Sequence, residues 1–260
     1  MIPEIHLGPI TLQSFGICFA LGFLASGAVI SRRFKELGHP PERAWEAIGA
    51  ALVGGLVGSR IDYLIQNASD LDGGILSNLI GGSGLVWFGG LIGGAIAVIL
   101  WARWRGLLGD DLMGAVAVAL PLGYAIGRIG CQLSGDGDYG KPWDGPWAMA
   151  YPDGVVPTDT PVHPTPIYET LVMGLVALGL WKVRNRFTGR ALLAIYLVAA
   201  GTERLLVEFI RLNSDVALGL TQAQLISCAL IIGGGAWLIW LARNDRLRPD
   251  GAAELDGSPA

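Results

Sequence analysis

Long apolar stretches separated by short polar segments dominate the chain. A helix needs about 20 mostly apolar residues to cross a bilayer. Seven stretches approach that length, and they cover residues 10–30, 47–65, 86–101, 112–131, 167–181, 191–210 and 220–241. The pattern predicts an all-α integral membrane protein, with one polytopic membrane domain over residues 1–242 and a polar tail over residues 243–260.

Positive residues occupy every second connecting segment. The segments after the first, third, fifth and seventh stretches contain Arg32, Arg33, Lys35, Arg43, Arg103, Arg105, Lys182, Arg184, Arg186, Arg190, Arg243, Arg246 and Arg248. The segment after the second stretch contains Asp70 and Asp72 instead, and Arg211 runs against the alternation. Because Lys and Arg accumulate on the cytoplasmic side of a membrane, we expect the N-terminus outside and the C-terminus in the cytoplasm.

The segment between the fourth and fifth stretches is unusually long and rich in proline. Residues 132–166 contain seven prolines together with Trp143 and Trp147, and the charge alternation places this segment outside the cytoplasm. Loops of this length within a compact domain are uncommon and are often functional. Anchoring of the tryptophans at the membrane interface is the alternative interpretation.

Composition excludes several classes of protein. Hydrophobic residues make up 52% of the chain and charged residues 15%, whereas soluble domains have about 25% charged residues. The net charge is −4 and no long basic run is present, so we expect no nucleic-acid partner. The three cysteines are far apart, and their spacing predicts neither a disulfide framework nor a metal site. We expect no metal and no cofactor.

Charged residues inside the apolar stretches are the most informative positions, because a charge in the bilayer is costly and commonly functional. They are Arg60, Asp62, Arg128, Glu169, Glu203, Arg204 and Glu208. The predicted orientation places this group toward the outer leaflet. Structural ion pairing and snorkelling to the interface are the alternatives.

Three charged residues near the end of the sixth stretch have helical spacing. Arg204, Glu208 and Arg211 follow one another at i, i+4 and i+7, so we expect them on one face of a helix. The planar guanidinium can hold two phosphate oxygens at once and keeps its charge. The sequence therefore predicts a site for an anionic lipid headgroup in the outer leaflet.

Two glycine pairs have the spacing of close helix contacts. Gly54 and Gly58 form one small-xxx-small pattern, and Gly89 and Gly93 form another. Helix packing is the default interpretation of such pairs in membranes. Close approach of a lipid to the backbone is the alternative.

Four ordered segments resemble the prolipoprotein diacylglyceryl transferases of bacterial inner membranes. They are GGLVGSRIDY at 54–63, WFGGLIG at 87–93, the run from GRIGC to DGDYG at 127–140, and HPTPIYE at 163–169. The last segment is followed in the sixth stretch by Glu203, Arg204, Glu208 and Arg211. The resemblance covers nearly the whole chain.

The resemblance implies an enzyme of the bacterial inner membrane with its active site toward the outer leaflet. Such an enzyme transfers the diacylglyceryl group of phosphatidylglycerol to the lipobox cysteine of a preprolipoprotein, which forms a thioether and releases glycerol 1-phosphate. The resemblance implies that Arg128 and Arg204 bind phosphate and that Glu169 and Glu208 are the buried acids. The residues expected to bind substrate are Arg60, Gly89, Gly90, Gly140, Tyr168 and Arg211.

Several positions depart from the family pattern. Phe88 stands where the family usually has His, Cys131 stands where it usually has Asn, and the stretch from Arg128 to Gly140 is about one residue longer. These changes leave open a divergent homologue with another acceptor, or an inactive one. A transporter and a non-catalytic lipid-binding protein are the rival classes.

The replacement of the usual histidine leaves the identity of the base open. His163 lies six residues before Glu169 and is the candidate, because an imidazole titrates near neutral pH. Proton transfer to the lipid phosphate is the alternative, and it would leave His163 with a structural role.

Overall fold

The computed structural model describes residues 1–67, 87–217 and 219–249, which form helices and short hairpins. The helices are α1 (Ser14–Glu36), α2 (Arg43–Gln66), α4 (Trp87–Arg105), α5 (Asp110–Ser134), α6 (Thr165–Val183), α7 (Gly189–Glu208) and α8 (Gln222–Arg243). The antiparallel hairpins pair β1 (Glu4–Leu7) with β2 (Ile10–Gln13), β3 (Met149–Tyr151) with β4 (Thr158–Val162), and β5 (Asp215–Ala217) with β6 (Leu220–Thr221). Asp70, Asp72 and residues 250–260 of the predicted tail lie outside the described residues.

Five of the described helices have the length and composition needed to cross a membrane, namely α1, α2, α5, α6 and α8. Helix α7 is not among them and carries Glu203, Arg204 and Glu208 close to its end. These helices confirm the prediction of an all-α membrane protein, and the number of seven spans stays a prediction. The first helix begins at Ser14 rather than at residue 10, because Ile10–Gln13 pairs with Glu4–Leu7 as a hairpin.

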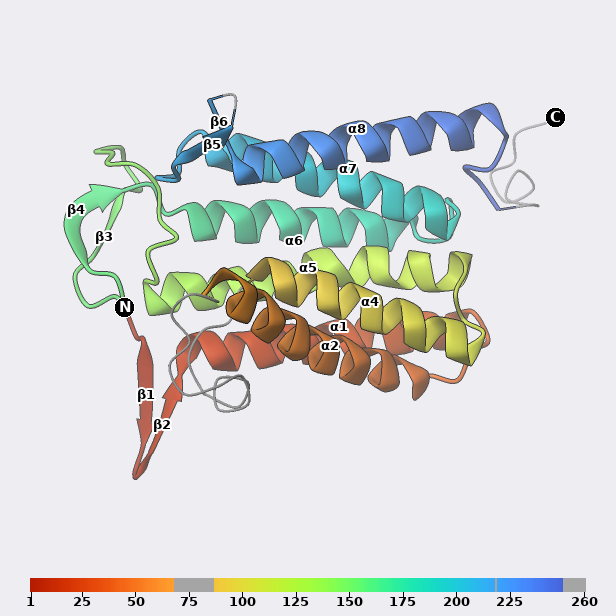
Figure 1. Cartoon of the computed structure of the whole chain (residues 1–260), viewed down its shortest axis with the longest axis horizontal. Coiled ribbons are helices and arrows are strands. Elements are labelled where there is room, and N and C mark those ends of the chain that lie inside the picture. The colour runs from red at the N-terminus through yellow and green to blue at the C-terminus, as the bar shows by residue number, and fades with distance from the viewer. Residues whose placement is uncertain (68–86, 218, 250–260) are drawn as a thin grey trace. The chain divides into compact units, whose positions relative to one another are not determined.

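The chain divides into two compact units, and each is described by itself: Ile30–Asp111 is one, and Met1–Val29 with Leu112–Ala260 is the other. In the first unit, α2 packs along α4 (Figure 1). A Cβ on Gly54 would lie 2.5 Å from the Gly93 carbonyl oxygen, and one on Gly58 would lie 2.3 Å from that of Gly89. The packing interpretation of both glycine pairs is therefore confirmed.

In the second unit, α7 lies along α8 and also packs against α6. A Cβ on Gly201 would lie 2.9 Å from the Ser227 carbonyl oxygen, so α7 and α8 also approach through a glycine. Ala117, Val118, Leu180 and Leu192 form a buried core that joins α5, α6 and α7.

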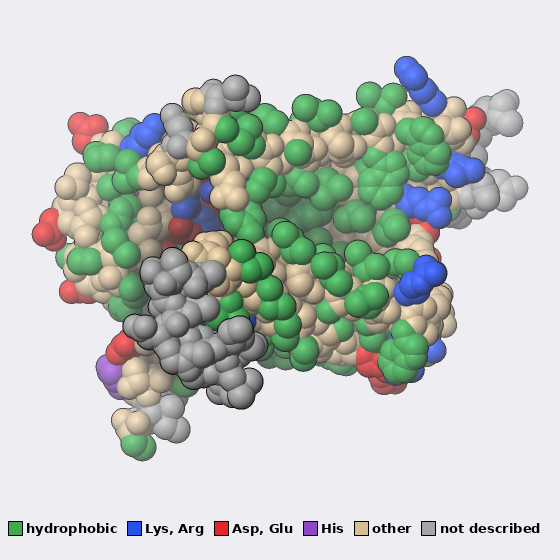
Figure 2. Space-filling view, viewed as in Figure 1, with side chains coloured by type: hydrophobic (Ala, Val, Ile, Leu, Met, Phe, Trp, Pro, Cys, Tyr) green, Lys and Arg blue, Asp and Glu red, His purple; other side chains and the backbone are tan. Residues whose placement is uncertain are grey.

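Large apolar side chains remain exposed along these helices, as Figure 2 shows in green. Leu171, Leu175 and Leu178 of α6 and Ile232 and Ile239 of α8 are each more than half exposed. Soluble proteins rarely expose contiguous apolar surfaces of this kind, whereas a surface that faces lipid is normally apolar. Exposure of these side chains therefore agrees with a membrane location.

The proline-rich segment folds back onto the ends of two helices. The backbone N–H of Gly140 donates to the His163 carbonyl at 2.8 Å, and that of Lys141 donates to the Ile210 carbonyl at 2.7 Å. The β3–β4 hairpin within the segment lies at the same end of its unit as β5 and β6 (Figure 1). Backbone hydrogen bonds thus place residues 138–142 between the start of α6 and the end of α7.

Candidate active site

Arg128 forms the centre of a buried charged cluster in the second unit. Its guanidinium projects from the last third of α5 and pairs with Glu169 of α6 through Nε and Nη2, and with Asp138 through Nη1. The Glu169 side chain is fully buried, and the Tyr124 hydroxyl donates to it at 3.3 Å. A buried carboxylate of this kind is tolerated only when cations and donors surround it.

Asp138 joins two arginines that are far apart in the sequence. One carboxylate oxygen pairs with Arg128 and the other with Nη2 of Arg211, while Nη1 of Arg211 donates to the Asp138 carbonyl at 2.9 Å. Thr165 also donates its hydroxyl to that carbonyl. Burial raises the pKa of Asp138, but the guanidiniums of Arg128 and Arg211 more than offset it and lower the pKa to about 2.

Arg204 is the most accessible of the three arginines. Its Nη1 lies 2.8 Å from Oε2 of Glu208 and 3.9 Å from Oε1 of Glu169. Its side chain is 27% exposed, against 12% for Arg128 and 9% for Arg211. Nη1 of Arg204 is buried, so any ligand would reach this side chain through its other atoms.

Glu208 connects this cluster to α8. Its Oε1 accepts hydrogen bonds from the Thr221 hydroxyl at 2.6 Å and from the Asn213 amide at 2.8 Å. Thr221 also caps α8, where the backbone N–H of Gln224 donates to its hydroxyl at 3.2 Å. The carboxylate that pairs with Arg204 is thus held by the segment that starts α8.

The structure brings Arg128, Arg204, Glu169, Glu208 and Arg211 together, as the sequence predicts, but Arg211 arrives differently. Helix α7 ends at Glu208, so Arg211 does not share its helical face with Arg204. Instead, Arg211 forms an isolated antiparallel bridge with Gly140. A Cβ on Gly140 would lie 2.5 Å from the Ile210 carbonyl oxygen, so glycine allows this close approach.

His163 and Tyr168 belong to a group of aromatic side chains beside the cluster. The His163 ring stacks on Trp143 with centroids 4.4 Å apart, and its Nδ1 lies 3.3 Å from the Tyr168 hydroxyl. Trp147 donates its indole N–H to the same hydroxyl at 2.8 Å. These contacts fix the imidazole, and its role as a base stays a prediction.

Arg60, Gly89 and Gly90 belong to the Ile30–Asp111 unit and are described within it. Arg60 is buried, with its guanidinium carbon 5.1 Å from the centroid of the Tyr63 ring. The backbone N–H of Gly89 donates to Asp62 at 2.9 Å, and a Cβ on Gly89 would lie 2.3 Å from the Asp62 Cβ. Helix packing therefore explains glycine at position 89, and substrate binding by these three residues stays a prediction.

Sequence reasoning missed Asp138 and Tyr124 as members of the cluster. Asp138 lies in the stretch that is longer than the family form, and a second acid soon after Arg128 was the available signal. Tyr124 lies in an apolar stretch and carries no such signal. The sequence places Glu203 among the charges expected toward the outer leaflet, but it assigns this residue no role in the site.

Cys131 lies beside Arg128, whose Nη1 is 3.4 Å from its sulfur. Ligand atoms of Cys131, Asp136 and Asp138 come within 4.8 Å of one another. Both Asp138 oxygens already pair with arginines, so we assign this group to the charged cluster and not to an ion. Burial, with the nearby charge of Asp138, raises the pKa of Asp136.

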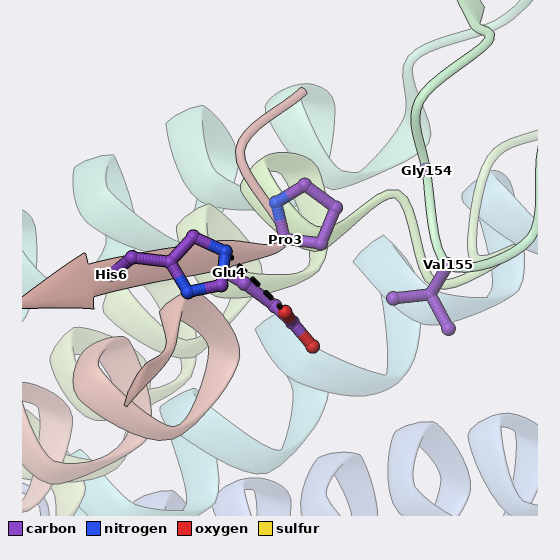
Figure 3. A pocket seen from close by; sticks show the side chains of 5 residues that line it. All are labelled: Pro3, Glu4, His6, Gly154 and Val155. Carbon is purple, nitrogen blue, oxygen red and sulfur yellow. Dashed lines mark ion pairs between the residues drawn. The ribbon is translucent and has the colours of Figure 1, made fainter. Parts of the chain in front are cut away.

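A shallow surface depression lies near the N-terminus, away from the charged cluster. Pro3, Glu4, His6, Gly154 and Val155 line it (Figure 3). Among these five lining residues, one ion pair joins His6 to Glu4 at 3.8 Å, and both side chains are exposed. Such a pair contributes little binding energy, so we assign no function to the depression.

Comparison with known sequences identifies relatives over nearly the whole chain. The profile of the family described as prolipoprotein diacylglyceryl transferase matches residues 4–240. Phosphatidylglycerol–prolipoprotein diacylglyceryl transferase from Methylococcus capsulatus is 32% identical over 244 residues, which cover 88% of this chain and 91% of the relative. The proteins of the same name from Vibrio vulnificus and Clostridium tetani are each 30% identical, covering 90% and 91% of this chain and 89% and 94% of their own lengths.

Proposed function

Because the chain belongs to the prolipoprotein diacylglyceryl transferase family, we propose that it transfers the diacylglyceryl group of phosphatidylglycerol to a cysteine thiol of a prolipoprotein. The acceptor is the cysteine of the lipobox segment, and the products are a thioether and glycerol 1-phosphate. The protein is thus a transferase that acts in lipoprotein biosynthesis.

The observation that carries this proposal is the buried cluster of three arginines. A phosphodiester headgroup needs cationic donors, and it develops further negative charge as its C–O bond breaks. Arg204 has the most exposed side chain of the three arginines, and Glu208 and Glu169 hold its Nη1 in place. Preorganised donors of this kind stabilise a developing anion most effectively where water is excluded.

Arg128 and Arg211 support the same phosphate site. Their donors are largely committed to Glu169 and Asp138, so they contribute fixed positive charge and orientation. Gly140, Tyr168 and His163 border the site from the proline-rich segment and the start of α6. Substrate binding by Arg60, Gly89 and Gly90, which belong to the Ile30–Asp111 unit, stays a prediction of the sequence.

We place the protein in the bacterial cytoplasmic membrane with seven spans, which adds α4 and α7 to the five helices described above. Residues 1–242 form one polytopic domain, the N-terminus lies outside and the polar tail is cytoplasmic. This orientation directs the charged cluster toward the outer leaflet, where an exported prolipoprotein and phosphatidylglycerol meet.

An activity assay tests this function, in which the purified protein is mixed with phosphatidylglycerol vesicles and a peptide that contains a lipobox cysteine. We expect mass spectrometry to detect a thioether-linked diacylglyceryl peptide together with an equal amount of glycerol phosphate. A peptide with Ser in place of that Cys is the control and should remain unmodified. Lipid binding or transport without either product would contradict the proposal.

A further inference from the structure

Among the described residues, two carboxylates of the charged cluster take part in none of its ion pairs, namely Asp136, which accepts a hydrogen bond from the Asp138 backbone N–H at 3.2 Å, and Glu203. Asp138 pairs with Arg128 and Arg211, Glu169 pairs with Arg128, and Glu208 pairs with Arg204. Glu203 makes no ion pair with any residue that the structure describes, and its Oε1 is buried without a hydrogen-bond partner there. The residue is only 5% exposed. A buried carboxyl oxygen without a partner is rare and calls for an explanation.

Helix geometry directs Glu203 away from α8. Gly201 faces α8, since its Cβ position is 2.9 Å from the Ser227 carbonyl oxygen. Glu203 lies two residues later, which is roughly 200° around a helix with about 3.6 residues per turn. Leu192, eleven residues before Glu203 and so on the same side of α7, packs with Leu180 of α6 and with Ala117 and Val118 of α5.

The charged and titratable groups around Glu203 come from every element on that side. Tyr124 and Arg128 of α5, Glu169 of α6, Tyr196 and Arg204 of α7, and Arg211 all interact with it electrostatically. Phosphate binding next to Arg204 would therefore take place beside this carboxyl group.

The transfer reaction releases one proton, and Glu203 can accept it without losing an ion pair or a hydrogen bond to its Oε1. Protonation of Asp138, Glu169 or Glu208 would each break at least one ion pair with an arginine of the cluster, which is unfavourable where the pair is shielded from water. Protonation of Glu203 breaks no ion pair. Phe88 occupies the position of the usual family histidine, and the His163 ring is held by Trp143 and Tyr168.

We propose that Glu203 accepts the thiol proton of the acceptor cysteine; this inference rests on the proposed function. The S–H bond breaks and the sulfur forms a bond to the glyceryl carbon. The C–O bond from that carbon to the phosphate breaks, and its electron pair goes to the phosphate oxygen. The proton passes to the Glu203 carboxylate, directly or through one water, and leaves with the glycerol phosphate.

Steady-state kinetics of Glu203→Gln and Glu203→Asp in phosphatidylglycerol vesicles tests the proposal. We expect the Gln variant to lose about 10²-fold or more in kcat, the usual contribution of a positioned base. Its KM for phosphatidylglycerol should stay within a factor of about three, because the phosphate-binding arginines remain paired. The Asp variant keeps an ionisable group and should recover part of the rate.

The pH profile separates a base from a structural residue. The wild-type rate should fall as the pH drops through the ionisation of the base, and the Gln variant should lack this acid limb because an amide does not titrate. Glu36→Gln, which alters an acid at the end of α1 outside the cluster, is the matched control and should keep the wild-type profile.

Three outcomes would overturn the proposal. A Gln variant with the wild-type kcat excludes Glu203 as the base, and so does a slow Gln variant whose acid limb is unchanged. Both leave the proposed function standing, since the wild-type protein still turns over. Absence of any thioether product from the wild-type protein would overturn the proposed function and this inference with it.

Discussion

The contact between α2 and α4 and the charged cluster on α5, α6 and α7 join helices by opposite means. Gly54 and Gly58 bring the backbone of α2 close to α4, with Cβ positions 2.5 Å and 2.3 Å from carbonyl oxygens. The cluster instead joins its helices through buried ion pairs centred on Arg128 and Glu169. The first contact relies mainly on close backbone approach at its glycines, with the Gly89 N–H bond to Asp62 and the Arg105–Glu46 pair at its edges, whereas the second relies on buried ion pairs.

This difference predicts how each region responds to substitution. A close-packed helix contact is destabilised by a substitution that adds volume at the contact, and it tolerates a substitution that adds none. A buried ion pair fails when either partner is removed, because the remaining charge has no counter-charge. The glycine contact should therefore affect stability, and the charged cluster should affect both stability and turnover.

Glu169→Gln should have the largest effect on stability. Loss of this fully buried carboxylate leaves Arg128 without its main partner, and breaking a buried pair costs about 3–5 kcal/mol. Glu46→Gln is the control, because Glu46 pairs with Arg105 while 37% exposed, and solvent screens such a pair, so its loss should cost far less. Unfolding in detergent measures both. Similar small losses in the two variants would contradict the importance of burial.

Gly58→Ala should have the next largest effect. Its Cβ would lie 2.3 Å from the Gly89 carbonyl oxygen and 2.7 Å from the Gly93 Cα, both of which are backbone atoms. Overpacking of this kind costs about 1–3 kcal/mol. Gly55→Ala is the matched control on the same helix, since its nearest atom is the Gly90 carbonyl oxygen at an ordinary 3.5 Å. Equal thermal stability of the two variants would show that the close contact does not matter.

Asp138→Asn should have a smaller effect on the free energy of unfolding, and this effect should depend on pH. Its pKa is about 2 in the folded protein, against about 3.9 for an unperturbed Asp. The folded-state pKa is lowered, so Asp138 stabilises the protein fully above about pH 4 and loses this contribution as the pH falls toward 2. The stability difference between wild type and Asp138→Asn should therefore shrink over that interval. A difference that stays constant down to pH 2 would rule out the proposed charge pairing.

The glycine contact and the helical architecture could be predicted from sequence because both are local patterns. The apolar stretches give the helices, and the spacing of Gly54 and Gly58 indicates a close-packed face within one helix. The N-terminal boundary was missed because Ile10–Gln13 is apolar enough to continue a span but pairs with Glu4–Leu7 instead.

The charged cluster could be predicted only in part. Arg128, Glu169 and Arg204 stand out because each is charged within an apolar stretch. Asp138 lies in a polar segment where an acid is unremarkable, and its role depends on backbone hydrogen bonds that bring residues 138–142 to the end of α7. Arg211 was predicted correctly as a member but for the wrong reason, since the helix ends before it.

The rate of thioether formation by Arg204→Lys tests the central claim most directly, namely that the Arg204 guanidinium binds the phosphate of the lipid donor. Lys keeps the positive charge but lacks the planar fork that holds two phosphate oxygens. We predict a loss of about 10²-fold or more in kcat/KM for phosphatidylglycerol, comparable to removal of one donor from an oxyanion site. Arg32→Lys, at an arginine whose side chain is 70% exposed on α1, should turn over as the wild type does. Near-normal turnover of Arg204→Lys would contradict the account.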